Sequence, residues 1–453
     1  VRGLVLTIRD DEVRQDLRRR ASRDPLTGLA NRSLLAERIA ACTGEVALLY
    51  IDLNGFKPIN DRLGHAAGDE VLVEVARRLV ESTRDSDTVA RLGGDEFAVL
   101  LEDVTMPEVI EISNRILEAL TASVEVAGTS AQLGASIGIA YGDGSESGEA
   151  LLRQADLAMY EAKGRGKAQY VAYEPSIGHA RLQRLELVEA LRRAIDLREL
   201  DVVYQPVVAT ESCRIAGVEA LARWQLDGTE VPPEVFVRIA EDTGLVVQMG
   251  ELILDQVAHD APSLREAAGG PISMSVNVSA RQLREPGFVQ VVERTVRAMG
   301  RTALVLEITE RQGVANDEQV LAAMQTIAAM GVRFAIDDFG VGFSSISYLQ
   351  DLPAHVVKTD AALAQNIDRD ERARAVLRAV TVMANSLGLD VVIEGVERQG
   401  QLDAVRDSVD APFVQGYLLH RPMGHETLLV AVRTNRRRAA TGPDHDEVLV
   451  PTA

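Results

Sequence analysis

Acidic side chains recur in this sequence at the ends of apolar segments. Asp52 follows the apolar run Val46–Ile51, and the segment Gly93–Glu96 (Gly-Gly-Asp-Glu) joins two further apolar runs. Paired glycines tolerate the positive φ of a tight hairpin, so Asp95 and Glu96 would lie at its tip. Carboxylates from two neighbouring strands suit Mg²⁺, which takes few protein oxygens and leaves the rest to substrate phosphates. The pattern predicts metal-assisted phosphoryl chemistry; a helix cap and a solvated turn are the alternative interpretation.

A second group of polar residues lies at the ends of predicted strands in the C-terminal half. Its members are Glu219, Asn277, Glu307, Glu310, Asp337, Asp338, Lys358, Asp360, Glu394, Glu397 and Gln415. In a barrel, the C-terminal ends of the strands converge on one mouth, so these carboxylates would crowd together. Crowded carboxylates raise one another's pKa unless cations neutralise them. Two metal ions would do so and would activate a water for attack at phosphorus.

The elements that must position the first group follow a mixed α+β pattern from residue 24 to about residue 173. The expected helices cover Arg32–Cys42, Asp69–Thr83, Pro107–Ser123 and Gly148–Lys163. The expected strands cover Val46–Asp52, Thr88–Leu92, Glu96–Leu101, Gln132–Tyr141 and Ala168–Tyr173. A charged helical connection, Arg181–Arg193, marks the boundary of this half.

The second group falls in a half where strands and helices alternate. The expected strands are Val203–Val208, Gly217–Trp224, Ile272–Ser279, Leu304–Thr309, Arg333–Phe339, His355–Asp360, Val391–Val396 and Phe413–Leu419. Eight strands with intervening helices over about 230 residues are typical of a (β/α)₈ barrel. The expected divisions are 1–20, 21–173, a linker at 174–181, 182–433, and a disordered tail at 434–453.

The first twenty residues read as the end of another domain. Residues 1–10 alternate like a strand, Glu12–Arg20 is a charged helical stretch, and the chain starts with Val. The segment looks like the last strand of a PAS-type sensor domain followed by a signalling helix, so we expect a fragment of a longer protein. An ordinary N-terminal arm is the alternative.

The composition narrows the class of protein. The 453 residues carry 48 Lys+Arg and 68 Asp+Glu, a net charge of −20. An acidic chain is a poor non-specific binder of nucleic acid or anionic membrane, and no apolar run approaches the roughly 18 residues of a membrane span. Two lone cysteines, Cys42 and Cys213, fit a reducing cytosol. We expect a cytoplasmic chain without a nucleic-acid partner, and it stays open whether a missing N-terminal region attaches the full protein to a membrane.

The first half resembles the GGDEF diguanylate cyclase family. The resemblance runs from Asp24–Arg32 through Ile51–Asp61, Gly64–Asp69 and Arg91–Phe97 to Lys163. It implies that the 3′-hydroxyl of one GTP attacks the α-phosphate of another. Because each domain would hold one GTP, it also implies a homodimer.

The resemblance also implies residue roles in this half. Asp52, Asp95 and the Leu53 carbonyl would bind two Mg²⁺ or Mn²⁺ ions, and Glu96 would support metal binding or take the 3′-hydroxyl proton, which makes Asp95 and Glu96 the catalytic pair. The substrate-binding residues carried over are Asn60 and Asp69 for guanine, and Phe56, Lys57, Lys163 and Lys167 for the triphosphate. Asn54 stands where many members carry a second Asp.

A regulatory site is a further implication. Arg84 and Asp87 form an Arg-x-x-Asp motif at the position of the product-inhibition site of this family. An Arg fork suits a guanine edge or a phosphate, and the Asp suits guanine N–H donors. A salt bridge at a helix end is the alternative interpretation.

The second half resembles the EAL cyclic di-GMP phosphodiesterase family over about residues 182–433, with linear pGpG as the expected product. The metal ligands carried over are Glu219, Asn277, Glu307, Asp337 and Asp338, with Asp360 and Glu394 close to the second ion, again two ions per site. Glu219 and Lys358 would be catalytic, Lys358 by orienting or deprotonating the water. Substrate-facing residues would be Gln205, Arg223, Glu397 and Gln415, and Glu310 would anchor the loop from Asp338 to Ser345.

Together these resemblances predict a multidomain fold, an α+β nucleotidyl-cyclase-like GGDEF domain followed by a (β/α)₈ TIM-type barrel EAL domain. The predicted function is bifunctional turnover of cyclic di-GMP. One alternative is a phosphodiesterase whose first half senses GTP. Another is a non-catalytic cyclic di-GMP receptor, which would usually have lost metal-binding acids that are present here.

Overall fold

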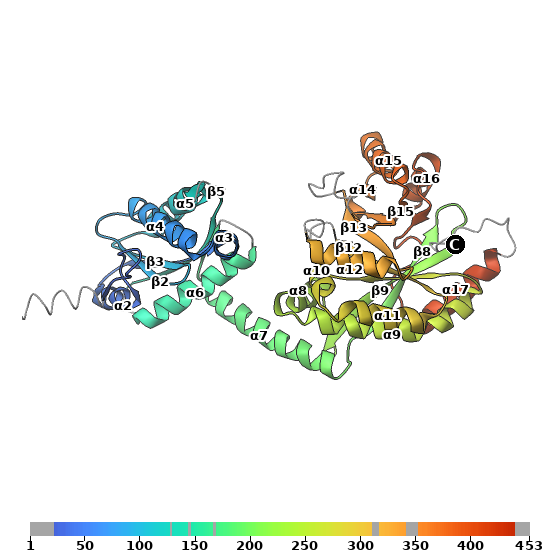
Figure 1. The fold of residues 1–453 in the computed structure, drawn as a ribbon, viewed down its shortest axis with the longest axis horizontal. Helices are drawn as coiled ribbons and strands as arrows, with labels where there is room; N and C mark the ends of the chain where they lie inside the picture. Colours follow the sequence, from blue (N-terminus) through green and yellow to red (C-terminus); the bar gives the residue numbers. More distant parts are fainter. Residues whose placement is uncertain are drawn as a thin grey trace, which may run out of the picture. The chain divides into compact units, whose positions relative to one another are not determined.

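The computed structural model describes residues 22–126, 129–143, 146–165, 169–309, 317–340 and 352–439. The chain divides into two compact units, Val1–Leu185 and Glu186–Ala453, and each carries its own sheet (Figure 1). Within these described ranges, no helix combines the length and the apolar character needed to cross a membrane. The segment 1–20, expected to end a sensor domain, lies outside them.

The first unit is built on a five-stranded sheet of order β2-β3-β1-β6-β7. Its strands are β1 (Val46–Asn54), β2 (Thr88–Gly93), β3 (Glu96–Glu102), β6 (Gly134–Gly142) and β7 (Gln169–Ala172), with a separate pair β4 (Val124–Val126) and β5 (Thr129–Ala131). Its helices are α2 (Arg32–Ala41), α3 (Phe56–Leu63), α4 (His65–Glu81), α5 (Met106–Thr121) and α6 (Gly148–Arg165). The expected α+β class is therefore confirmed.

The central strand β1 is buried on both faces because helices cover each of them. Leu49 and Ile51 face α4 and α5, whereas Leu48 and Tyr50 face α2 and α6. Successive side chains of a strand alternate between faces, so Asp52 must share the face of Tyr50 and α6. The alternation of side chains therefore places the Asp52 carboxylate on the face of the sheet that α6 covers.

Helix α3 is absent from the expected elements. It spans only eight residues and starts after Gly55, which adopts φ 86. A short helix after a left-handed glycine, following a strand directly, gives too little periodicity for recognition from sequence. Its apolar residues Phe56 and Ile59 are buried in the core.

The second unit is a closed barrel of strands. The order β9-β11-β12-β13-β14-β15-β16-β8 closes through a β8–β9 pairing, and β10 (Thr229–Val231) extends β9 as a hairpin. The barrel strands are β8 (Asp201–Ala209), β9 (Ile215–Leu226), β11 (Ser273–Asn277), β12 (Ala303–Thr309), β13 (Arg333–Phe339), β14 (Val356–Thr359), β15 (Asp390–Ile393) and β16 (Phe413–Val414). The eight expected strands and the TIM-type barrel are confirmed.

The first strand of the barrel departs from the regular order in which each strand is followed by a helix. β8 pairs antiparallel with both β9 and β16, while the other neighbours pair parallel. The cause is local, because the segment between Ala209 and Ile215 is a tight connection that leaves no room for a helix, so β9 must run back along β8.

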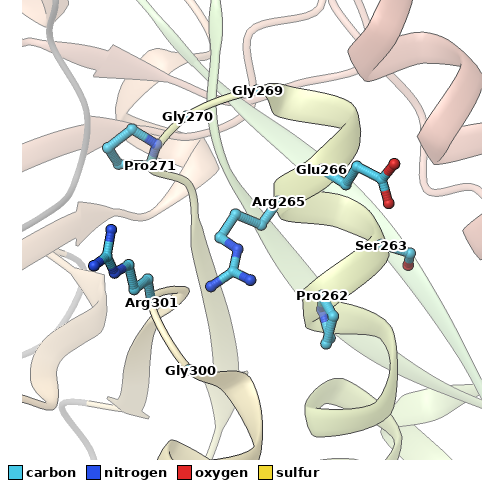
Figure 2. Close-up of a pocket in the computed structure, with 9 residues that line it drawn as sticks. All are labelled: Pro262, Ser263, Arg265, Glu266, Gly269, Gly270, Pro271, Gly300 and Arg301. Atoms are coloured by element: carbon cyan, nitrogen blue, oxygen red, sulfur yellow. The ribbon is translucent and has the colours of Figure 1, made fainter.

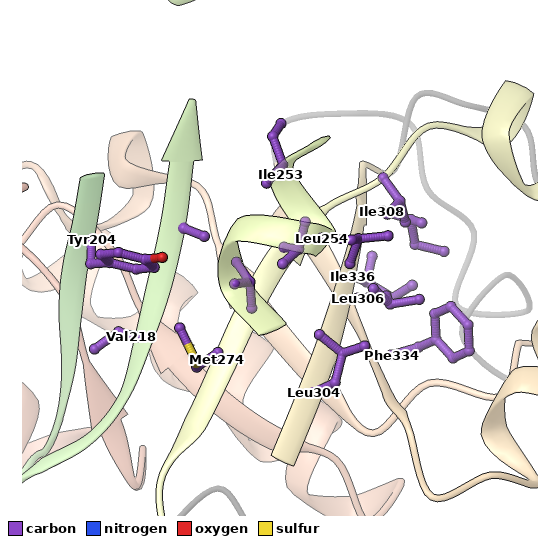
Figure 3. Close-up of a cluster of buried hydrophobic side chains, with 14 of the residues drawn as sticks. Tyr204, Val218, Ile253, Leu254, Met274, Leu304, Leu306, Ile308, Phe334 and Ile336 are labelled. Atoms are coloured by element: carbon purple, nitrogen blue, oxygen red, sulfur yellow. The ribbon is translucent and has the colours of Figure 1, made fainter. Parts of the chain in front are cut away.

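Helices surround the barrel. They are α8 (Pro233–Thr243), α9 (Val246–Ala268), α10 (Ala280–Arg284), α11 (Phe288–Met299), α12 (Glu318–Ala328), α14 (Ala361–Ala364), α15 (Glu371–Ser386), α16 (Gln399–Ser408) and α17 (His425–Ala439). Figure 3 shows apolar side chains of the strands, such as Met274, Leu306 and Ile336, meeting Leu254 of α9. The outward face of the barrel strands is therefore the main core of this unit.

Two helices differ from the expected boundaries. α7 (Pro175–Asp196) is one continuous helix that includes residues 175–181 of the expected linker 174–181. α17 continues to Ala439, beyond the expected start of a tail at residue 434. Asn435 explains this, because its side chain accepts from the Ile215 N–H and donates to the Cys213 carbonyl, both at 2.9 Å. Residues 440–453 lie outside the described ranges.

Candidate functional site

In the first unit, the acids of the two motifs meet at the end of β1. Asp52 is opposite Glu96 in the antiparallel register of β1 and β3, and Asp52 is only 7% exposed. Lys163 of α6 donates to Asp52 Oδ1 at 2.6 Å. Tyr50, two residues before Asp52 on the same face, donates to Glu96 Oε2 at 2.9 Å. A cation and a phenol therefore orient the two acids.

The glycine hairpin has the conformation that its sequence predicts. Gly93 and Gly94 have φ values of 147 and 53, and β2 and β3 shift register beside them. Arg91 donates to the Gly94 carbonyl at 2.8 and 3.1 Å and pairs with Asp24 at 3.2 Å. The hairpin that bears Asp95 is thus held by an arginine whose counter-ion lies 67 residues earlier in the chain.

A cavity of about 350 Å³ lies against these acids. Its lining includes Leu53, Lys57, Asp95 and Lys163. Asp95 also ties this hairpin to β1, since its carbonyl accepts from the Leu53 N–H at 3.3 Å. The cavity therefore combines two lysines with a carboxylate, a set that suits a phosphate with a bridging cation.

The two expected guanine-reading residues lie on neighbouring helices. Asn60 of α3 sits against Gly68 of α4, where an added Cβ would lie 1.8 Å from Asn60 Oδ1. That oxygen is buried and has no hydrogen-bond partner among the described residues. Asp69, the next residue of α4, is exposed. The orphaned acceptor and the free carboxylate are available to a ligand.

Three other residues expected in the sites of this unit, Phe56, Arg84 and Asp87, make contacts typical of an apolar core or of a helix end. Phe56 lines the cavity but is 7% exposed and belongs to the apolar core. The Asp87 carboxylate accepts from the Arg84 backbone N–H at 2.7 Å, while the Arg84 side chain pairs with Glu108 at 3.2 Å. These are contacts of a helix end, as the alternative interpretation expects. Lys167 lies outside the described ranges.

In the second unit, the barrel interior gathers four carboxylates around one ammonium. Lys358 Nζ of β14 lies 3.1 Å from Glu219, 2.8 Å from Glu307, 3.5 Å from Asp337 and 2.7 Å from Glu394. Glu219 is positioned further by two amides, because Asn277 and Gln415 donate to it at 2.9 and 2.8 Å. Each of these residues comes from a different barrel strand or follows one.

The charges of this acid cluster (Glu219, Glu307, Asp337, Glu394 and Lys358) do not balance. Burial, followed by the Glu219 carboxylate, raises the pKa of Glu307 well above its usual range, and burial raises the pKa of Glu394 to about 8. For Glu219, burial is outweighed by the Lys358 ammonium and the hydrogen bonds, so its pKa is lowered. One ammonium cannot compensate four ionised carboxylates, so the cluster favours the binding of protons, as the raised pKa values indicate, or of further cations.

Strand β13 contains a β-bulge at its two consecutive aspartates, Asp337 and Asp338. Ile336 pairs with Val357 and Phe339 with Thr359, so β13 carries one extra residue between these pairs. Asp338 takes φ 56 and is exposed, while Asp337 lies against Lys358. A bulge redirects side chains locally, which allows adjacent acids to serve one mouth instead of opposite faces.

The remaining expected residues of the barrel make their described side-chain contacts outside this cluster. Asp360 accepts from the Ala362 N–H at 2.7 Å as a helix cap, and Glu397 is exposed. Gln205 lies opposite Glu219 in the β8–β9 register and donates to the His420 carbonyl at 3.3 Å. Arg223 pairs with Glu230 at 3.5 Å. Glu310 lies outside the described ranges.

Among the described residues, no three acidic, histidine or cysteine side chains stand in the arrangement of a metal site. The donor chemistry nevertheless fits hard divalent cations. Asp337 Oδ1, Glu394 Oε1 and Gln415 Oε1 are buried and accept no hydrogen bond within the described ranges. The first two face the Lys358 ammonium, Glu394 Oε1 at 2.7 Å and Asp337 Oδ1 at 3.5 Å, so a bound cation would share these oxygens with Lys358.

Comparison with known proteins agrees with this organisation. Residues 21–169 match the family described as "Diguanylate cyclase, GGDEF domain" and residues 188–422 match the family described as "EAL domain". The chain is 35% identical over 424 residues to "Bifunctional diguanylate cyclase/cyclic di-GMP phosphodiesterase MucR" of Pseudomonas aeruginosa, covering 91% of this chain and 62% of that protein. It is 33% identical over 443 residues to "Cyclic di-GMP phosphodiesterase NbdA" of the same organism, covering 95% and 56%.

A solved structure resembles the second unit. It is described as "PaMucR Phosphodiesterase, c-di-GMP complex" and matches with a TM-score of 0.50 and 34% identity, over 54% of this chain and 99% of that chain. The chain spans 56–62% of the length of the two curated relatives named above. The order of the two matched domains, each with its own unit and acid site, shows that the chain belongs to the family of proteins in which a GGDEF domain precedes an EAL domain.

Proposed function

We propose that this chain turns over cyclic di-GMP, making it from two GTP molecules in the first domain and hydrolysing it to pGpG in the second. The observation that carries the proposal is the buried acid cluster around Lys358, which a structural role does not require. The name of MucR and the cyclic di-GMP complex of the PaMucR phosphodiesterase support the choice of substrate.

In the phosphodiesterase site, the acids of the cluster would hold two Mg²⁺ or Mn²⁺ ions. The proposed ligands are Glu219, Asn277, Glu307, Asp337, Asp338, Asp360 and Glu394. When bound, these ions would supply the positive charge that the cluster lacks and an activated water. Lys358 would orient that water, since its ammonium already lies within 3.5 Å of four carboxylates. Gln205, Arg223, Glu397 and Gln415 would face the substrate, and Glu310 would anchor the adjoining loop.

In the cyclase site, Asp52, Asp95 and the Leu53 carbonyl would hold the cations. The Lys163 contact with Asp52 at 2.6 Å supports a shared place for metal and phosphate. Lys57, Lys163, Phe56 and Lys167 would surround the triphosphate, and Asn60 and Asp69 would read guanine. Glu96, fixed by Tyr50, would accept or relay the 3′-hydroxyl proton.

The proposal includes a homodimer for synthesis. The cavity beside the acids of the first domain has a volume of about 350 Å³, which suits one nucleotide. Since the reaction joins two GTP molecules, two such domains would have to face each other. Arg84 and Asp87 would bind product as an inhibitory site only if the Arg84–Glu108 pair opens.

A second candidate is a phosphodiesterase in which the first domain binds GTP as a regulator. NbdA aligns with 95% of this chain, and its name mentions only the phosphodiesterase. This name favours the regulatory candidate. Both sites retain their acids in this chain, which supports the bifunctional proposal over the regulatory one.

The test is a nucleotide assay on the full chain. Purified protein is incubated with Mg²⁺ and either GTP or cyclic di-GMP, and the nucleotides are separated by chromatography, with EDTA as the control. Cyclic di-GMP from GTP supports synthesis and pGpG from cyclic di-GMP supports hydrolysis. GTP-stimulated hydrolysis without synthesis would favour the regulatory candidate. Binding without turnover of either nucleotide would overturn both.

A further inference from the structure

A cavity of the second unit lies away from the acid cluster. Its volume is about 1030 Å³, and Arg265, Gly269, Pro271, Gly300 and Arg301 are among its lining residues. Pro271 precedes β11 and Arg301 precedes β12, so the cavity opens at the N-terminal ends of strands whose C-terminal ends carry Asn277 and Glu307. We therefore treat it as separate from the proposed catalytic mouth.

Two arginines face this cavity from different segments. Figure 2 shows Arg265 of α9 and Arg301 after α11 extending toward the same space, and the carboxylate of Glu266 also belongs to the lining of the cavity. Neither guanidinium has a hydrogen bond or ion pair within the described ranges. Glu266 offsets one of these charges, but it forms no ion pair with either arginine in the described part of the chain. Positive charge therefore prevails locally, in a chain whose net charge is −20, once the third arginine described below is counted.

A third guanidinium reaches the same rim. Arg436 of α17 lies over Gly269, where an added Cβ would be 2.1 Å from its Cζ and Nη1. Gly269 has φ 67, and Gly300, also at φ 67, lies beside Arg265, with 3.3 Å from an added Cβ to Nη1. Glycines at these two helix ends thus let three guanidinium groups approach the backbone of one cavity.

Helix capping alone does not account for this arrangement. α9 and α11 both end at the cavity, and the partial negative charge of their C-termini does attract cations. Yet the Gly269 N–H already bonds the Arg265 and Glu266 carbonyls, and in the described part of the chain no guanidinium donor of Arg265 or Arg301 reaches a carbonyl. The planar donors of the arginines therefore remain available, in a geometry suited to phosphate oxygens.

We propose that this cavity binds a soluble oligophosphate, such as the phosphate chain of a nucleoside di- or triphosphate. Three guanidinium groups on one rim match several adjacent phosphates better than a single one, and about 1030 Å³ is enough for a nucleotide. The site does not depend on the proposed turnover of cyclic di-GMP, because it shares no residue with either acid site.

The experiment measures binding of inorganic triphosphate to the full chain by isothermal titration in EDTA, where metal-mediated binding is absent. The double variant Arg265→Gln/Arg301→Gln removes two positive charges and is compared with Arg372→Gln/Arg378→Gln on α15, which removes two exposed arginines away from the cavity; Arg378→Gln alone is the control for a single charge. We expect the Arg265→Gln/Arg301→Gln double variant to lose at least about 10-fold in affinity and both α15 variants to match the parent protein. Orthophosphate should bind more weakly than triphosphate.

Several results would overturn the proposal. One is a triphosphate affinity of the double variant equal to that of the parent protein. Another is a loss of affinity in the α15 control equal to that of the double variant, which would show that net charge alone determines binding. Binding to vesicles of equal phosphatidylcholine and phosphatidylglycerol, without binding of triphosphate, would indicate a lipid surface instead. If the double variant unfolds, the single variant Arg301→Gln replaces it, since Arg301 is exposed. A lower midpoint of unfolding with unchanged triphosphate affinity would indicate that the arginine only caps a helix.

Discussion

At the scale of single residues, Lys358 provides the positive charge at the centre of the acid cluster. Its ammonium is buried to 2% exposure among four carboxylates from strands far apart in the sequence. Those carboxylates raise the pKa of Lys358 well above its usual value, despite burial that acts in the opposite direction. The same side chain that we propose to orient a catalytic water is therefore the cation on which the metal-free fold depends.

We predict that Lys358→Met destabilises the metal-free protein strongly. Removing one partner of a buried ion pair leaves uncompensated charge, which typically costs about 3–5 kcal/mol. The measurement is urea denaturation in EDTA. Adding Mg²⁺ should restore part of the loss, because divalent cations would neutralise the same carboxylates. Arg378→Gln is the control, and a Lys358→Met protein as stable as the parent in EDTA would contradict the role given to the ammonium.

At the scale of elements, the first domain depends on close packing of α6 on β6. An added Cβ at Gly138 would lie 2.0 Å from the Ala155 carbonyl oxygen and 2.1 Å from the Met159 nitrogen. No side chain fits between this strand and this helix. Because α6 also carries Lys163, the position of this glycine sets the distance between Lys163 and Asp52.

Gly138→Ala should therefore destabilise the first domain by at least about 2 kcal/mol, because backbone atoms on both sides have to move. Gly142→Ala is the matched control on the same strand, since its added Cβ would lie no closer than 3.7 Å to any atom. Urea denaturation compares the two. We also expect synthesis of cyclic di-GMP to fall in Gly138→Ala alone; equal stability of both variants would contradict this account of the packing.

A buried polar network links β8, α9 and α17 of the barrel. The Tyr204 hydroxyl donates to Asp260 at 2.6 Å, Gln256 donates to the same oxygen at 3.0 Å, and His425 lies 3.7 Å from it. Burial, followed by the hydrogen bond to Asp260, raises the pKa of Tyr204 above its usual value. The network thus favours the neutral phenol in the folded state.

Tyr204→Phe should lower the free energy of unfolding by about 1–3 kcal/mol, because Asp260 loses a buried donor. The sign of the pH effect follows from the raised pKa of Tyr204: its contribution is complete below the unfolded pKa of about 10 and is lost as the pH rises further. The parent should therefore lose stability above about pH 10 more steeply than the variant. Tyr417→Phe, at an exposed tyrosine, should match the parent; identical pH profiles of parent and Tyr204→Phe would refute the assignment.

At the scale of the whole molecule, the chain holds two independent sets of acids. Each set lies within one of the two compact units. The two reactions proposed above should therefore be separable by single substitutions.

We predict that Asp95→Ala abolishes only synthesis and that Glu219→Ala abolishes only hydrolysis. Each change removes a carboxylate that lies in one site and leaves the other acid set intact. Chromatography of products from GTP and from cyclic di-GMP measures both activities in parallel, with Asn54→Asp as a control that restores the commoner family residue. Loss of both activities in either alanine variant would show that the sites are coupled.

Some of this organisation was predictable from the sequence because it depends on neighbours in the chain. Alternating apolar residues fixed the strands, and the paired glycines Gly93 and Gly94 indicated the hairpin that both positive φ values confirm. The short helix α3 was missed, since eight residues carry too little periodicity. The tyrosine that binds Glu96 was missed as well, although its spacing of two from Asp52 places both on one face.

Other features were decided only by the tertiary structure. The Lys358 contacts join residues up to 139 positions apart, and they exist because closure of the barrel brings the strand ends together. The bulge at Asp338 and the antiparallel first strand depend on how neighbouring strands pair. The arginine cavity likewise forms where α9, α11 and α17 end near one another. Local sequence sets which face of a strand a side chain occupies, whereas packing between distant segments sets what that side chain meets.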